Sequence, residues 1–342
     1  MRLAGPAFLL LVAASARASS ISDQISAGTS QATPQNPRAG SVSNLLRASM
    51  DLGEQWTLSA DAQITLEEPT PAPPGAAAGF QDRGGTVTDF SASLDWDVTD
   101  NWTVGGTLGI SPQSTTGIVA PVTVIDPSTG RQANADGLIR VVNSSGYVEL
   151  VAGYDTAGES SLEWSFMAGI SLNRFETRQR LEQAQLASGR VITLNQLRTS
   201  GELRSARLSG GITATLFTDT DVTLNGDYYG YADDPAGVGY FSIAGPTRNF
   251  SSGAGVPIAP LHYLIRPELL HRFGDFSLRL WAQAGRYMPG TGQTTAGVGL
   301  KGQYKLTRSF KMWASASGQN DVDSSSQSSK SGTFALGATY RF

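Results

Sequence analysis

Two histidines, His262 and His271, are the side chains best suited to proton transfer near neutral pH in this chain. A hydrolytic centre would need one of them beside a serine and a carboxylate or amide. The two lie nine residues apart on one predicted strand, so they occupy opposite faces, and His262 is expected on the polar, inward face that also carries Arg266 and Glu268. No Ser-His-Asp arrangement is assembled by spacing, and we therefore predict no enzyme and no catalytic residue.

Metal and thiol chemistry have equally little support. The chain of 342 residues contains no cysteine, which excludes disulfides, iron–sulfur clusters and cysteine-ligated zinc. The acidic segments 233–237 (DDPAG) and 321–326 (DVDSSS) lack the ligand spacing of a calcium loop. We expect no metal and no cofactor.

The remaining candidates for chemistry are charged side chains, and these fall into two groups along the chain. Carboxylates predominate on the predicted strands from 55 to 232, and cations on those from 258 onward. The exceptions are Arg207 in the first region and Glu268 in the second. The residues assigned to the polar faces of these strands are Asp61, Asp89, Asp95, Glu149, Glu163 and Asp227 in the first group, and Arg266, Arg279, Lys301, Lys305, Lys311 and Arg341 in the second. Their meaning depends on where those faces point.

The strands that carry these charges are recognised by alternation with period two. In segment 55–66 (QWTLSADAQITL), apolar residues occupy the even positions from Trp56 to Leu66 and polar residues the odd ones. Successive side chains of a strand point to opposite sides, so this segment is a strand with two unlike faces. The same pattern recurs from about residue 42 to the end. The chain is predicted to be all-β.

The connections between the strands also alternate, between short turns and longer segments. The short turns are 52–55, 98–101, 156–160, 218–221, 273–276 and 307–309, and the long connections are 67–85, 112–143, 174–201, 233–257 and 320–331. This pattern predicts an up-and-down antiparallel meander with two unlike ends. Segment 174–201 is the most promising inserted loop, and its part 177–186 (TRQRLEQAQL) could form a short helix.

The first residues have the features of a secretory signal peptide, which are Arg2, an apolar stretch over 7–14, and the small residues Ala16 and Ala18 at a cleavage site. We predict a signal peptide at 1–18 and a single β-barrel at 19–342. Cleavage would remove Arg2 and Arg17 from the 25 basic residues, leaving 23 against 29 acidic ones and a net charge of −6. Nucleic acid is therefore not an expected partner.

Large aromatic residues of the apolar face gather beside the short turns. These residues are Trp56, Trp96, Trp102, Phe273, Phe276, Phe310 and Phe342. A transmembrane barrel carries such an aromatic girdle at the membrane interface, here on the periplasmic side. In the alternative, a soluble barrel, bulky residues would instead cap the rim of an internal core.

The last residues, 337–342 (GATYRF), decide between these alternatives. They resemble the C-terminal assembly signal of bacterial outer-membrane β-barrels, with Gly337, Tyr340 and Phe342 at its three positions; the polar residue usual two before the glycine is Ala335 here. The resemblance implies insertion in the bacterial cell outer membrane, both termini on the periplasmic side, and contact with the barrel-assembly machinery, lipid and lipopolysaccharide.

Counting back from Phe342 gives thirteen strands, and segment 20–28 can supply another, so a barrel of about 14 strands is predicted, with 12 or 16 as alternatives. Asp23 makes this first strand a poor one, because it lies in phase with Ile21 and Ile25. A barrel of this size is wider than the eight-stranded kind that side chains fill. A pore is the natural expectation.

In such a barrel the polar face lines the lumen, and the acidic and basic groups would stand on opposite walls. We hypothesise a transverse field that orients dipolar solutes; the alternative is that these charges are hydrated or pair with a plug. The inward aromatic residues are Trp281, Trp313, Tyr229 and Tyr231, which could stack on a solute or pack against a loop.

The sequence thus favours an outer-membrane, porin-like channel for passive diffusion of small polar solutes. Two other functions remain open: a non-conducting structural or adhesive barrel that binds partners through its long loops, and a plugged uptake channel for apolar compounds. A monomer is expected, because general porins that trimerise usually have more strands.

Overall fold

The computed structural model describes residues 20–31, 39–69, 80, 84–156, 162–216, 218–233, 261–287, 294–322 and 328–341. They form the 14 strands β1 (Ser20–Gln31), β2 (Ala39–Asp51), β3 (Trp56–Glu67), β4 (Gly85–Asp97), β5 (Trp102–Ile125), β6 (Gln132–Asp155), β7 (Leu162–Leu186), β8 (Val191–Leu216), β9 (Thr220–Tyr231), β10 (Leu261–Phe273), β11 (Phe276–Tyr287), β12 (Thr294–Lys305), β13 (Phe310–Val322) and β14 (Ser328–Arg341). The predicted signal peptide at 1–18 and Phe342 lie outside the described residues.

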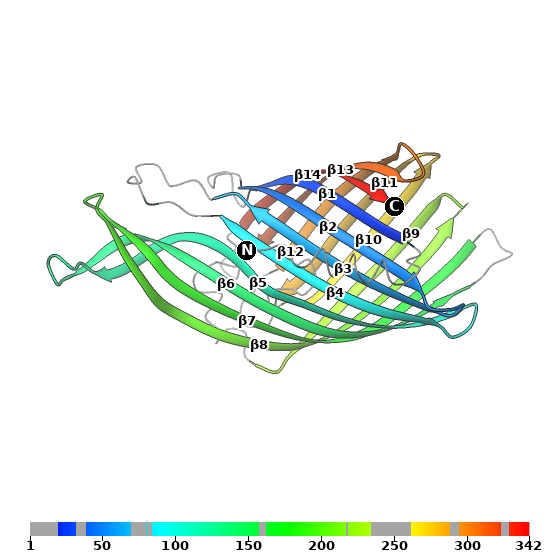
Figure 1. Cartoon of the computed structure of the whole chain (residues 1–342), viewed down its shortest axis with the longest axis horizontal. Helices are drawn as coiled ribbons and strands as arrows, with labels where there is room; N and C mark the ends of the chain where they lie inside the picture. The colour runs from blue at the N-terminus through cyan, green and yellow to red at the C-terminus, as the bar shows by residue number, and fades with distance from the viewer. Residues whose placement is uncertain are drawn as a thin grey trace.

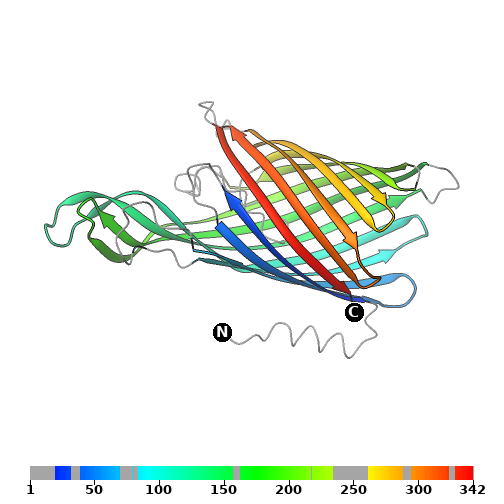
Figure 2. The ribbon, with the colours of Figure 1, turned by 90° about the horizontal axis from the view of Figure 1, so that it is seen from above.

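Each strand pairs antiparallel with its neighbours in the chain, and β14 pairs with β1, so the sheet closes into a barrel (Figures 1 and 2). The prediction of an up-and-down meander of about 14 strands is confirmed. The first strand exists although its sequence pattern is poor. Asp23 does point to the outer face, where its carboxylate accepts a hydrogen bond of 2.6 Å from the Asn44 side chain on β2.

The apolar face of the barrel points outward. Large apolar side chains that alternate with polar ones are among the most exposed of the molecule, including Leu108 (60%), Leu150 (58%), Leu224 (50%) and Val298 (65%). A soluble barrel would bury this face, because exposing to water an apolar surface that continues round the whole molecule is energetically unfavourable. The barrel is therefore a transmembrane one, with lipid as the solvent of its outer face.

Rings gather on the outer face near the short turns, as the sequence pattern predicted. Trp56 of β3 stacks on Trp96 of β4 with ring centroids 5.3 Å apart, and Trp102 of β5 lies 4.9 Å from the ring of Tyr154. Phe273 of β10 and Phe276 of β11, which flank one short turn, lie 6.2 Å apart. Phe310 pairs in register with Tyr340 near the end of β14. Their role as a periplasmic girdle remains a prediction.

Four strands are about twice as long as the rest. β5 to β8 have 24 to 26 residues, whereas the other strands have 12 to 14. About ten residues suffice to cross a bilayer. The excess of some 12 residues, at about 3.3 Å each, carries the four strands roughly 40 Å beyond the barrel wall. We call this part, residues 115–142 and 175–202, the extension (Figure 1, left).

The extension corrects two predictions of long loops. Segments 112–143 and 174–201 lie mostly in paired strands, and the helix proposed for 177–186 is wrong. Alternate side chains are buried from Thr177 through Gln179 to Leu181, and after a bulge the phase changes so that Ala184 and Leu186 are buried. Hydrogen bonding to β6 and β8 on both sides outweighs the local helix propensity of its Gln, Glu, Leu and Arg residues.

A small apolar core holds the extension together. Its buried residues come from β5, β6 and β7 and are Val122, Val124, Ala135, Ile139, Val141, Leu181, Ala184 and Leu186. Gly137 of the middle strand β6 allows this packing, because a Cβ there would stand 2.7 Å from Val122 Cγ1 and 2.8 Å from Leu181 Cδ1. Side chains of β5 and β7 thus meet over the bare backbone of β6.

We expect Gly137→Val to separate Val122 from Leu181 and to loosen the extension while the barrel stays folded. Limited proteolysis of the purified protein should then cut within 115–142 or 175–202 at least several-fold faster. Gly146→Val is the matched control on the same strand, because its nearest neighbour would be 3.6 Å away. Equal protease resistance in the two variants would contradict this role of Gly137.

The tips of the two long hairpins are tied together by an ion pair. Arg190, beyond β7, donates to the carboxylate of Asp126, beyond β5. The same carboxylate accepts hydrogen bonds from the backbone N–H (2.9 Å) and hydroxyl (2.8 Å) of Ser128. The hydrogen bonds from Ser128, together with Arg190, hold the pKa of Asp126 below its usual value.

Because the pKa of Asp126 is lowered, the stabilisation from its ion pair with Arg190 is fully present above the pKa of an unfolded aspartate, near 4. This stabilisation is lost as the pH falls through the lower pKa of Asp126 in the folded state. Backbone hydrogen exchange at residues 126–131 should therefore accelerate, relative to the barrel, as pH is lowered below about 4. Asp126→Asn should make this relative rate independent of pH. A pH dependence that persists in the variant would show that another group is responsible.

Candidate functional site

Three of the six predicted lumen carboxylates, Asp61, Glu149 and Asp227, lie beside an arginine. Arg47 of β2 forms two hydrogen bonds of 2.8 Å with the carboxylate of Asp61 on β3. A cavity of about 270 Å³ lies beside this pair and is lined also by Ser59, Ser91 and Ser93. Asp61 therefore faces the lumen as half of an ion pair.

Two more predicted carboxylates share one cation. Arg207 of β8 donates to Glu149 of β6 and lies 4.0 Å from Asp227 of β9. The three side chains are about one-fifth exposed. Sequence reasoning placed Arg207 on this wall but gave it no role, since its partners lie two strands and one strand away.

The other predicted carboxylates differ in exposure. Asp89 on β4 is buried, at 4% exposed. Asp95, nearer the short-turn end of the same strand, lies against Gly105 of β5. Glu163 lies exposed at the short-turn end of β7.

The basic wall, formed by β10 to β14, keeps an excess of cations. Glu268 of β10 lies 2.9 Å from the guanidinium of Arg266 and 3.5 Å from that of Arg279. Within the described part of the chain, no carboxylate lies within 4.0 Å of the other four predicted cations, which are Lys301, Lys305, Lys311 and Arg341. Local pairing thus weakens the charge of the acidic side more than that of the basic side. The transverse field remains a hypothesis.

The predicted lumen aromatics form two different arrangements. Trp281 of β11 and Trp313 of β13 lie flat on the wall, where a Cβ on the adjacent Gly299 or Gly337 would overlap their rings. The glycines thus provide the room for the indoles.

Tyr229 and Tyr231 instead belong to a cluster at the end of the barrel opposite the short turns. In this mouth cluster, Tyr229, Leu261 and Tyr287 are buried, with Tyr231 and Leu264 packed against them. The Tyr231 hydroxyl donates a 2.7 Å hydrogen bond to the Leu261 carbonyl. Leu261 was not predicted to face inward because a bulge between Leu261 and Tyr263 changes the phase of β10. Tyr287 lies in phase with Trp281 on β11, so the alternation of that strand was a signal that could have identified it.

The histidines lie outside the lumen arrangement. His271 Nδ1 is 2.7 Å from the Thr220 hydroxyl on the outer face, and its ring packs on Phe273. His262, expected to point inward, lies against the ring of Tyr228, which faces outward, because the same bulge displaces it. Among the described residues, no group of three His, Asp or Glu side chains could hold a metal ion.

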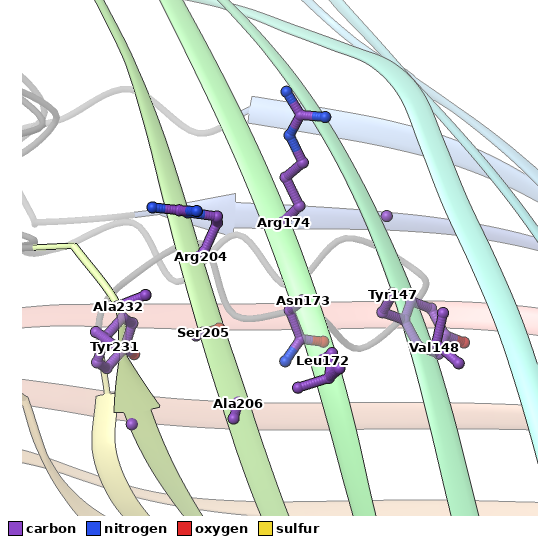
Figure 3. Close-up of a pocket in the computed structure, with 12 residues that line it drawn as sticks. Tyr147, Val148, Leu172, Asn173, Arg174, Arg204, Ser205, Ala206, Tyr231 and Ala232 are labelled. Carbon is purple, nitrogen blue, oxygen red and sulfur yellow. The ribbon is translucent and has the colours of Figure 1, made fainter.

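A groove of about 660 Å³ runs across β6 to β9 where the extension leaves the barrel (Figure 3). Alternation places Val148, Leu172 and Ala206 on the outer face along one side of it. Arg174 and Arg204 border the other side, and both are compensated, Arg174 by Glu176 and Glu202 and Arg204 by Asp233. Hydrogen bonds from Arg204 lower the pKa of Asp233. The groove is lined also by Tyr147, Asn173, Ser205 and Tyr231, which alternate to the inner face.

Comparisons with known proteins extend the description of the fold. No model of a known protein family matches the chain, and no curated protein does. Among solved structures, it is similar to the Pseudomonas putida toluene transporter TodX, with 12% identity, a TM-score of 0.51, and 95% of this chain and 90% of that chain covered.

Two further solved structures resemble the chain to the same degree. The Ralstonia pickettii toluene transporter TbuX has 12% identity and a TM-score of 0.55, covering 94% of this chain and 89% of the other. The monoaromatic hydrocarbon channel CymD has 11% identity and a TM-score of 0.52, covering 94% and 88%. At these identities the likeness concerns the fold. Across the described residues, no helix has the length and apolar character needed to cross a membrane. With its closed barrel, its apolar outer face and this fold, the chain is a bacterial outer-membrane β-barrel protein of 14 strands.

Proposed function

We propose that the barrel is an uptake channel that admits small apolar compounds, with aromatic hydrocarbons as the substrate class. The observation that carries this proposal is the mouth cluster. Tyr229, Leu261 and Tyr287 are buried on the inner face at the outer end of the lumen, where a pore for polar solutes would keep a hydrated opening.

The similar structures agree with this substrate class, since TodX and TbuX are toluene transporters and CymD is a monoaromatic hydrocarbon channel. Passive diffusion of small polar solutes, which the sequence favoured, becomes the second candidate. It is supported by the charged lumen wall around Arg47, Asp61 and Arg207.

The test measures uptake of radiolabelled toluene and of a radiolabelled small sugar by Gram-negative cells that express the protein. Toluene uptake should rise above that of the empty strain, whereas sugar uptake should not. Leu261→Asn should reduce toluene uptake about tenfold, because a polar group in the mouth cluster raises the barrier by about 1.4 kcal/mol.

Leu270→Asn is the matched control for this variant. Leu270 also faces inward on β10 but pairs with Arg279 near the short turns, away from the mouth cluster. Both variants must reach the outer membrane in equal amounts. Sugar uptake without toluene uptake would instead favour the polar-solute channel.

A further inference from the structure

The wall formed by β10 to β14 combines indole rings with cations in the half of the lumen nearer the short turns. Lys301 of β12 extends toward β13, where its Nζ lies 4.3 Å from the centroid of the Trp313 ring. Arg266 of β10 lies over Trp281 of β11 at 5.6 Å. Each indole thus has glycine backbone on one side and a cation on the other.

A third cation of this wall lies next to Lys301. Arg279 of β11 is the direct cross-strand neighbour of Lys301, so two positive charges lie side by side on the inner face. Like charges directly opposite one another destabilise a sheet unless something compensates them. Glu268 reaches Arg279 only at 3.5 Å and is shared with Arg266, and no described carboxylate lies within 4.0 Å of Lys301.

The indole itself has an unused hydrogen-bond donor. Trp313 Nε1 is buried and has no hydrogen-bond partner among the described residues, although a buried indole N–H normally finds one. The wall therefore brings together the edge of an apolar ring, a buried N–H and two adjacent cations.

We infer that this wall binds aromatic carboxylates as they pass through the lumen. The carboxylate would accept hydrogen bonds from Lys301, which has no described carboxylate within 4.0 Å, and from Arg279, which shares Glu268 with Arg266, while the ligand ring packs beside Trp313. A hydrocarbon alone would not need the two cations, and an inorganic anion would not need the indole. The inference rests on the proposed function in one respect only, which is that the lumen admits aromatic molecules.

The experiment is equilibrium dialysis of the purified full-length protein in detergent against radiolabelled benzoate, and separately against radiolabelled toluene. Benzoate should bind, and Lys301→Met should weaken its binding about tenfold, because one charge-assisted hydrogen bond is lost. The same variant should leave toluene binding within about twofold. Trp313→Leu should weaken the binding of benzoate. Acetate, added as a competitor of benzoate, has no ring, so its own binding should not weaken in this variant.

Lys330→Met is the control, since Lys330 lies exposed on β14 and, by the alternation of that strand, outside the lumen. Retention of heat-modifiable mobility on gels shows that each variant is folded. Benzoate binding that is unchanged in Lys301→Met, or displaced equally well by acetate, overturns the inference. Toluene uptake by cells tests the proposed function separately: its absence together with intact benzoate binding would reject the hydrocarbon channel and keep the aromatic-carboxylate site.

Discussion

Gly337→Val is expected to abolish most assembly of the barrel. Gly337 lies on β14, between β13 and β1, at the seam where the sheet closes. A Cβ at this position would overlap the Trp313 ring and stand 2.8 Å from the Ile25 carbonyl oxygen. The indole and the backbone of β1 cannot both give way without opening the seam. Overpacking of this kind costs about 1–3 kcal/mol or more.

The measurement is the fraction of protein that keeps the fast mobility of a folded barrel on unheated gels. We expect this fraction to fall to a small part of the wild-type value. Gly332→Val on the same strand is the control, because the nearest atom to a Cβ there, the Ser317 carbonyl oxygen, is 3.8 Å away. If both variants fold equally well, the close approach of Trp313 to Gly337 has no part in closure.

Arg207→Met should destabilise the folded barrel by about 2–3 kcal/mol, the second largest effect that we predict. The change leaves Glu149 without its ion-pair partner and removes the cation nearest to Asp227. Removal of one partner from a fully buried pair costs about 3–5 kcal/mol, and the partial exposure of these side chains reduces that figure. The measurement is the urea midpoint of the protein folded into lipid vesicles.

An exposed ion pair provides the comparison for Arg207. Arg174→Met removes a guanidinium that is 61% exposed and pairs with Glu176 and Glu202, and should cost at most about 1 kcal/mol. The double variant Glu149→Gln with Arg207→Met should recover part of the loss, because it removes an uncompensated carboxylate. Equal losses for Arg207→Met and Arg174→Met would refute the special position of Arg207.

Local pattern was enough to predict the barrel, since a strand pointing one face to lipid and the other to the lumen must alternate with period two. This rule placed Asp61 and Arg266 on the inner face and Trp56 on the outer one, as observed. It failed in segment 177–186, where residues with good helix propensity are held in a strand by neighbours on both sides. It also failed at His262, where a bulge changes the phase.

The sequence by itself therefore determined the fold class, the strand number to within a pair, and the face of most side chains. All three depend on the repeat of single strands and on the spacing of turns. Tertiary structure alone decided the partners: Arg207 for Glu149, Lys301 over Trp313, and the cluster that joins Tyr229 to Tyr287. These contacts join residues on different strands, and the register, the bulges and the curvature of the closed sheet that bring them together are not properties of any one strand.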